Sequence, residues 1–198
     1  MYSEEEIKKR KEKIFEVAVC CFNEEGYENT TIETIAARAG ISKGGLYHYF
    51  RSKKELFLEL FDYNVNRYFQ HIKSFIATSH TPEEKLRILV RKAGEILRQH
   101  EQFYRFCLEF LSMGVRDPEI KKVMTRFYKN SLETFQEIIE EGVEKGFFSK
   151  EDPRTVARSL YLSVMGAFFT FFSVDVDFEL SDQHEFDLNN VLNRIKIK

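Results

Sequence analysis

Apolar residues recur along this chain with a spacing close to 3.6, and that pattern constrains the fold more than any other feature. Sets such as Ile14, Ala18 and Phe22 repeat from one end to the other, and no segment alternates convincingly between apolar and polar residues as a strand would. All three prolines follow Asp or Thr, which is typical of a helix start, and they are Pro82, Pro118 and Pro153. The sequence therefore predicts an all-α fold of about nine helices.

Two short helices joined by a tight turn are predicted near 31–38 and 43–50, followed by a long helix over 53–78. Capping residues mark the three starts, namely Thr30 with Glu33, Ser42, and Ser52 with Glu55. Gly40 can supply the positive φ that the turn needs. This is the pattern of a helix-turn-helix, whose second helix enters the major groove of DNA.

The second short helix carries an unusual pair, Gly44 and Gly45, in its first turn. Each glycine inside a helix costs roughly 0.5–1 kcal/mol relative to alanine, so the pair needs a further reason. From Ile35 to Lys54 there are five Lys or Arg and no Asp or Glu, although the whole chain has a net charge of -2. A positive patch with a thinly covered backbone favours close approach of a phosphate strand.

The stretch "TTIETIAARAGISKGGLYHYFRSKKELF" closely resembles the DNA-binding region of the TetR family of repressors. The resemblance implies a homodimer that binds a near-palindromic double-stranded DNA operator and is released by a small ligand. It places Thr31 and Lys53 at phosphates, Lys43 and Gly44 at the groove edge, and Tyr47 and His48 near phosphates or bases. The complete predicted DNA-binding set is Thr31, Arg38, Ser42, Lys43, Gly44, Gly45, Tyr47, His48, Tyr49 and Lys53.

The resemblance also implies two domains. Residues 1–52 would form the DNA-binding domain, with the helix-turn-helix at about 31–50, and residues 53–198 a helical ligand-binding and dimerisation domain, with helix 53–78 as connector. No apolar signal core opens the chain, and the uncharged run 159–174 is shorter than the ~20 residues of a membrane helix. We therefore expect a cytoplasmic protein with no membrane partner and read that run as a buried helix.

In the family architecture the last two long helices form the dimer interface. Here they are expected over about 154–173 and 183–196, and the first is apolar on nearly all sides. A partner subunit would cover such a helix. The predicted interface residues are Leu160, Val164, Ala167, Phe168, Phe171, Phe172, Leu188 and Leu192.

Two aromatic stripes on successive helices suggest an elongated apolar ligand cavity. The predicted ligand-binding residues are Phe103, Phe106, Cys107, Phe110, Met113, Phe127, Ser131 and Phe135, which could equally be ordinary core. Few charges lie on these stripes, so we favour a fatty acid or acyl thioester with Arg105 or Arg126 near its polar end. A lipophilic cation, with Glu109 as counter-charge, is the alternative.

No catalytic residue, metal site or cofactor is predicted. Neither a Gly-x-Ser-x-Gly, P-loop nor His-Glu-x-x-His motif occurs, and three cysteines without ligand spacing suggest neither a disulfide framework nor a metal centre. The chain is therefore not expected to be an enzyme. An activator of the same architecture, or a helical ligand-binding or adaptor protein without DNA binding, remains open at this point.

Overall fold

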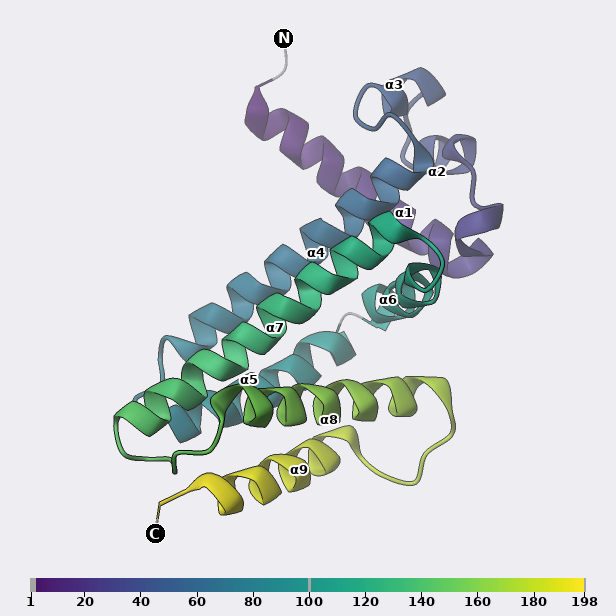
Figure 1. Ribbon diagram of the computed structural model, residues 1–198. Helices are drawn as coiled ribbons and strands as arrows, with labels where there is room; N and C mark the ends of the chain where they lie inside the picture. Colours follow the sequence, from purple (N-terminus) through teal and green to yellow (C-terminus); the bar gives the residue numbers. More distant parts are fainter. Residues whose placement is uncertain (1–2, 100, 198) are drawn as a thin grey trace. The chain divides into compact units, whose positions relative to one another are not determined.

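The computed structural model describes residues 3–99 and 101–197, with side-chain positions given outside 97–100. Along these residues the secondary structure consists of helices and no β-strand, which confirms the all-α prediction (Figure 1). The nine helices are α1 (Glu4–Asn29), α2 (Ile32–Arg38), α3 (Lys43–Tyr47), α4 (Lys53–Ile76), α5 (Pro82–Gln99), α6 (Glu101–Gly114), α7 (Pro118–Glu144), α8 (Pro153–Ser173) and α9 (Leu180–Ile195). Each of the three prolines begins a helix, as predicted.

The contacts divide the chain into two compact units. Unit 1 comprises Met1–Arg67 and His100–Met124, and unit 2 comprises Tyr68–Gln99 and Thr125–Lys198. Unit 1 thus contains α1, α2, α3, most of α4, all of α6 and the first turns of α7. The assignment of separate functions to 1–52 and 53–198 stays a prediction.

Aromatic rings in stacked and edge-to-face contact fill the core of unit 1. Phe57 of α4 lies with its ring centroid 5.0 Å from Phe22 of α1, 4.8 Å from Phe106 and 4.9 Å from Phe110 of α6. Phe110 also stacks on Phe61 at 4.0 Å, and all five side chains are at most 2% exposed. Burying such rings together is strongly stabilising, so α6 belongs to the hydrophobic core that supports the helix-turn-helix.

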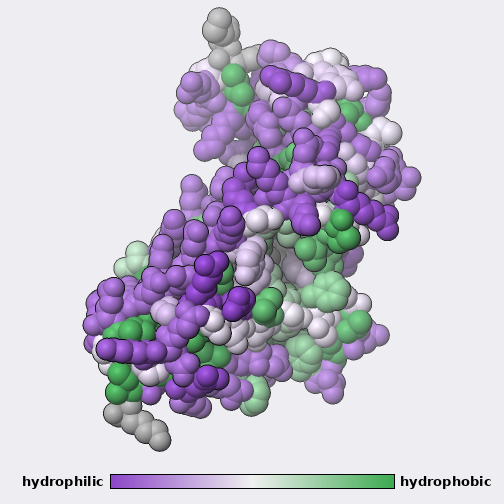
Figure 2. Space-filling view, in the orientation of Figure 1, coloured by the Kyte–Doolittle hydropathy of each residue, from purple (hydrophilic) through white to green (hydrophobic). Residues whose placement is uncertain are grey.

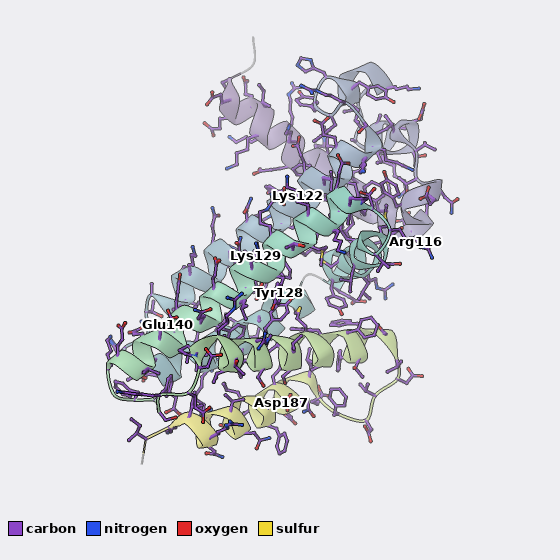
Figure 3. The ribbon with its side chains drawn as sticks, in the orientation of Figure 1. Arg116, Lys122, Tyr128, Lys129, Glu140 and Asp187 are labelled. Atoms are coloured by element: carbon purple, nitrogen blue, oxygen red, sulfur yellow. The ribbon has the colours of Figure 1, made fainter. Side chains whose placement is uncertain are left out.

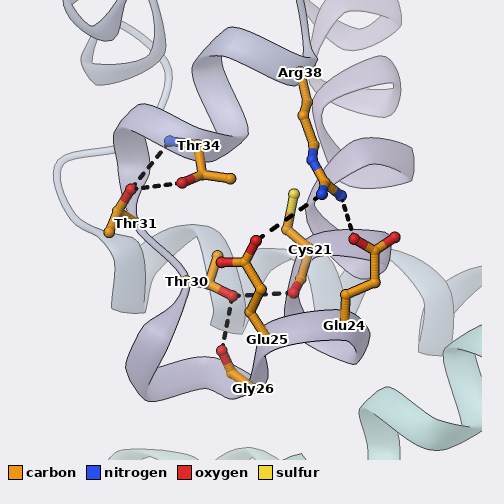
Figure 4. Close-up of polar contacts among 8 residues, drawn as sticks. All are labelled: Cys21, Glu24, Glu25, Gly26, Thr30, Thr31, Thr34 and Arg38. Carbon is orange, nitrogen blue, oxygen red and sulfur yellow. Dashed lines mark hydrogen bonds and ion pairs between the residues drawn. The ribbon is translucent and has the colours of Figure 1, made fainter.

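Local capping determines where the short helices begin. Thr31, one residue later than the expected Thr30, caps α2 by accepting the amide of Thr34 at 3.1 Å. The hydroxyl of Thr30 instead donates to the carbonyls of Cys21 and Gly26 at the end of α1 (Figure 4). Gly40 has the expected positive φ of 69° between α2 and α3.

The third helix is shorter than predicted. Ser42 caps it by accepting the amide of Gly45 at 3.0 Å, and Leu46 anchors it with a fully buried side chain. The helix ends at Tyr47 rather than near 50, and Phe50 turns back into the core.

In unit 2, α9 packs against both α5 and α8. Leu180, His184, Leu188, Leu192 and Ile195 of α9 are all buried within the chain. The chain that joins α7 to α8 folds back under α7, where a Cβ on Gly142 would lie 2.0 Å from the Phe148 ring. Glycine is therefore required at 142. The buried residues of α9 make this C-terminal helix part of the core of unit 2.

By length and mean hydropathy alone, α8 is apolar enough to cross a membrane. The same composition occurs in core helices of soluble proteins, and α8 packs along α9. The predicted buried run is thus helical, although several of its side chains are exposed.

Candidate nucleic-acid interface

The outer surface of α3 gathers most of the predicted DNA-binding residues. Lys43, Gly44, Tyr47 and His48 are exposed, with Tyr47 45% accessible, whereas Gly45 is half-buried. Thr31, Arg38 and Ser42 are also exposed, and Tyr49 and Lys53 are half-buried. The helix-turn-helix therefore presents short, polar and cationic side chains around the first turn of its second helix.

The two glycines of α3 differ in their surroundings. A Cβ on Gly44 would meet only the Ser42 hydroxyl, at 4.0 Å, so the protein itself leaves the position open. A Cβ on Gly45 would lie 3.3 Å from that hydroxyl and 3.7 Å from the Cβ of Ile41. The internal packing therefore accounts for glycine at 45 and gives no reason for glycine at 44.

The cations around α3 are paired within unit 1. Lys43 Nζ lies 2.5 Å from Glu33, and this contact lowers the pKa of the Glu33 carboxyl. Arg38 lies 2.6 Å from Glu24 and 3.9 Å from Glu25 of α1 (Figure 4). These pairs are exposed, so a phosphate group could replace the carboxylate at modest cost.

Lys53 is held by the backbone. Its Nζ donates to the carbonyl oxygens of Tyr27, Glu28 and Thr30 at 2.6, 3.1 and 2.9 Å, and it lies 4.4 Å from the centre of the Tyr27 ring. Because these carbonyls end α1, the cation caps that helix and ties it to the start of α4.

We expect Lys53→Met to lower thermal stability rather than to remove a phosphate contact. Removing hydrogen bonds worth about 1–2 kcal/mol should lower Tm by roughly 2–4 °C per kcal/mol. The slope of log affinity against log salt should stay unchanged, whereas Lys43→Met should reduce it by about 0.9 for each phosphate that the lysine neutralises. Thermal melts and DNA titrations at several salt concentrations measure both; a reduced slope for Lys53→Met would restore its predicted phosphate role.

Two family models match the chain. The model for bacterial regulatory proteins of the tetR family matches residues 14–60, and that for the C-terminal part of BetI-type transcriptional repressors matches residues 82–172. The chain belongs to the TetR family. Its proteins are transcription regulators rather than enzymes, and the family models and relatives support a transcriptional repressor of the TetR type.

This TetR chain is similar to three proteins of known name or structure. It is 26% identical over 143 residues to the HTH-type transcriptional repressor KstR2 of Mycobacterium tuberculosis, covering 72% of this chain and 71% of that protein. The regulator FadR from Bacillus subtilis, solved in complex with stearoyl-CoA, has a TM-score of 0.80 at 22% identity over 91% of this chain and 97% of its own. A transcriptional regulator from Saccharomonospora viridis in complex with choline has a TM-score of 0.84 at 21% identity over 96% and 100%. The two structures show the fold and leave the ligand of this protein open.

The predicted ligand residues of this TetR protein fall into both units. On α6, Phe106 and Phe110 are completely buried in the core of unit 1, whereas Phe103, Cys107 and Met113 are half-buried. On α7, Phe135 and Ser131 are buried in unit 2, and Ser131 donates its hydroxyl to the carbonyl of Phe127. Phe127 is half-buried, 5.9 Å from Phe69. Phe106 and Phe110 thus have the core role that the sequence analysis left open beside ligand binding.

The predicted dimer residues differ in how far they are buried within the single chain, and their contact with a partner stays a prediction. Leu160, Val164, Phe168, Leu188 and Leu192 are at most 6% exposed, so little of their surface is available to a partner. Ala167, Phe171 and Phe172 are half-buried.

Helix α8 exposes a different stripe, formed by Leu162, Gly166 and Phe169, which we call the outer stripe of α8. Leu162 and Phe169 are 58% and 54% exposed, and apolar side chains reach the surface over α8 in Figure 2.

Polar contacts between α6, α7 and the DNA-binding helices were not predicted. Lys54, at the start of α4, lies 2.8 Å from Asp117 and also pairs with Glu119, both at the start of α7. Glu109 of α6 accepts the backbone amide of Tyr27 in α1. No short sequence pattern could indicate these contacts, because the partners lie more than 60 residues apart in the sequence.

Proposed function

We propose that this protein is a dimeric repressor that binds a near-palindromic operator through α3 and is released by a long apolar acyl compound. The observation that carries the DNA-binding part is the open backbone of Gly44 at the first turn of α3, flanked by the exposed Lys43 and Tyr47. Major-groove readers place the start of their second helix against the bases. Two copies would present two such helices to the two halves of the operator.

The outer stripe of α8 supports dimerisation. Leu162, Gly166 and Phe169 follow at i, i+4 and i+7, so they share one side of the helix. A Cβ on Gly166 would have no neighbour within 4 Å, which leaves room for close approach of a second chain. Exposed apolar stripes of this kind mark contact surfaces.

An acyl ligand is favoured over a lipophilic cation because of what Glu109 contacts. This carboxylate accepts the Tyr27 amide and helps to hold α1, so it is already used as an acceptor. Arg105, a candidate for the polar end, lies 2.9 Å from Glu101 and its side chain is 66% exposed. The stearoyl-CoA complex of FadR shows that a protein of this fold can hold an acyl thioester. We also expect the protein in the cytoplasm, where an operator and acyl thioesters are both present.

The test is a gel-shift titration against operator DNA selected from genomic fragments. With about 6–10 phosphate contacts, affinity should fall roughly 10³–10⁵-fold between 50 and 200 mM salt. Palmitoyl-CoA should release the DNA and cetyltrimethylammonium should not. Absence of any selected DNA would contradict the repressor proposal, and release by the cation alone would contradict only the acyl ligand.

A further inference from the structure

Three tyrosines from three helices form a cluster in unit 2. Tyr68 comes from α4, Tyr128 from α7, where Figure 3 labels it, and Tyr161 from α8. The rings of Tyr128 and Tyr161 meet edge to face with centroids 5.1 Å apart. Each side chain is half-buried. An apolar ring adjoins the cluster, since the ring centroid of Phe69 lies 5.3 Å from that of Tyr68 and 5.9 Å from that of Phe127.

None of the three hydroxyls has a hydrogen-bond partner among the residues that the structure describes. In that part of the chain the sealed polar side-chain atoms without a partner are Ser79 Oγ and His184 Nε2, so the three phenol oxygens still face open space. Tyrosine hydroxyls that are largely buried normally have a partner. Three hydroxyls without a hydrogen-bond partner in one cluster therefore point to a bound ligand that supplies the partner.

Two of these phenols, Tyr68 and Tyr161, are partly shielded from water. Burial raises the pKa of Tyr161 to about 12, with a further contribution from Tyr128. Burial likewise raises the pKa of Tyr68, and the phenol of Tyr161 adds to that effect. The hydroxyls of Tyr68 and Tyr161 are therefore partly shielded from water without being sealed inside the core. Near pH 7 tyrosine hydroxyls keep their protons and can donate.

We propose that Tyr68, Tyr128 and Tyr161 bind the oxygen atoms at the polar end of an apolar ligand, a carboxylate or a thioester carbonyl. The inference rests on the acyl ligand proposed above and assigns that ligand's polar end to neutral hydroxyl donors instead of Arg105 or Arg126. Carboxylate and carbonyl oxygens accept hydrogen bonds from hydroxyl groups. A quaternary ammonium has no lone pair to offer, so it would leave all three hydroxyls unpaired. The edge-to-face contact of Tyr128 with Tyr161 also covers part of the ring surface that a cation would need.

The test replaces only the hydroxyls. Tyr68→Phe, Tyr128→Phe and Tyr161→Phe, singly and combined, are titrated with palmitic acid, palmitoyl-CoA and cetyltrimethylammonium by equilibrium dialysis. The combined variant should bind one or both acyl probes about 10–100-fold more weakly than the unmodified protein does. Weaker binding of palmitic acid alone assigns a carboxylate, and weaker binding of both assigns the carbonyl group that they share.

Two further measurements separate this from loss of structure. The combined variant should melt at the same or a higher temperature without ligand, because it no longer carries unpaired hydroxyls, and should bind operator DNA unchanged. Tyr63→Phe is the matched control, since Tyr63 lies in unit 1 and its hydroxyl accepts from Arg67 at 3.3 Å. Unchanged acyl binding by the combined variant would overturn the assignment while leaving the acyl repressor intact. Failure of the unmodified protein to bind either acyl probe would overturn both.

Discussion

Leu162→Glu combined with Phe169→Glu is expected to make the protein a monomer and to weaken operator binding by about 10²–10⁴-fold. The effect follows because a dimer binds its second half-site intramolecularly, and that gain disappears when the chains separate. Both side chains are more than half exposed in the single chain, so glutamate can be accommodated without disturbing the core. Sedimentation at micromolar concentration and gel-shift titration measure the two effects.

The control for this prediction is Val115→Glu, which changes an apolar side chain that is 83% exposed and lies in unit 1. It should remain dimeric and bind the operator normally. Point variants are preferable to truncation of α9, because that helix buries Leu188 and Leu192 within its own unit. A stable dimer in the double variant would place the subunit contact elsewhere.

Gly44→Ala is expected to abolish most DNA binding while slightly stabilising the folded protein. Alanine in a helix is favoured over glycine by roughly 0.5–1 kcal/mol, and the added Cβ meets nothing closer than the Ser42 hydroxyl at 4.0 Å. In the complex with DNA, the same methyl group would lie where the backbone of α3 is expected to come closest to the DNA. The poorer fit of α3 to the bases should cost about 1–3 kcal/mol per half-site, or roughly 10–100-fold.

Gly45→Ala gives a contrasting result at the neighbouring position. Its Cβ would press on the Ser42 hydroxyl at 3.3 Å and disturb the cap that holds the start of α3. We therefore expect this variant to melt at a lower temperature. Thermal melts beside gel shifts distinguish the two glycines, and normal operator binding by Gly44→Ala would mean that DNA does not approach this turn closely.

Most of the fold could be predicted because its signals are local. Each proline that follows Asp or Thr in this chain begins a helix. Gly40 indicates a turn because glycine readily adopts the positive φ that the turn needs. The one-residue shift from Thr30 to Thr31 has a tertiary cause. The hydroxyl of Thr30 is drawn to the end of α1, a partner that spacing within the segment could not indicate.

The candidate sites were harder to predict because apolar residues do not reveal what they contact. Phe106 and Phe127 each belong to one of the two predicted stripes. Phe106 is buried in contact with Phe57, whereas Phe127 is only half-buried. On α8 the pattern predicted an apolar helix correctly. Which face turns inward depends on α9, whose packing against α8 places Leu160 inside and Leu162 outside.

The bonds of Lys54 to Asp117 and of Glu109 to the Tyr27 amide affect how chimeric regulators should be built. A graft of residues 1–52 onto a foreign ligand domain would leave behind Lys53, the aromatic rings of α6 and the acceptor of that amide. The portable module for operator recognition is instead discontinuous, running to residue 67 and resuming over 101–124. A biosensor that keeps this operator and gains a new input therefore calls for three junctions, one after residue 67, one before residue 101 and one after residue 124.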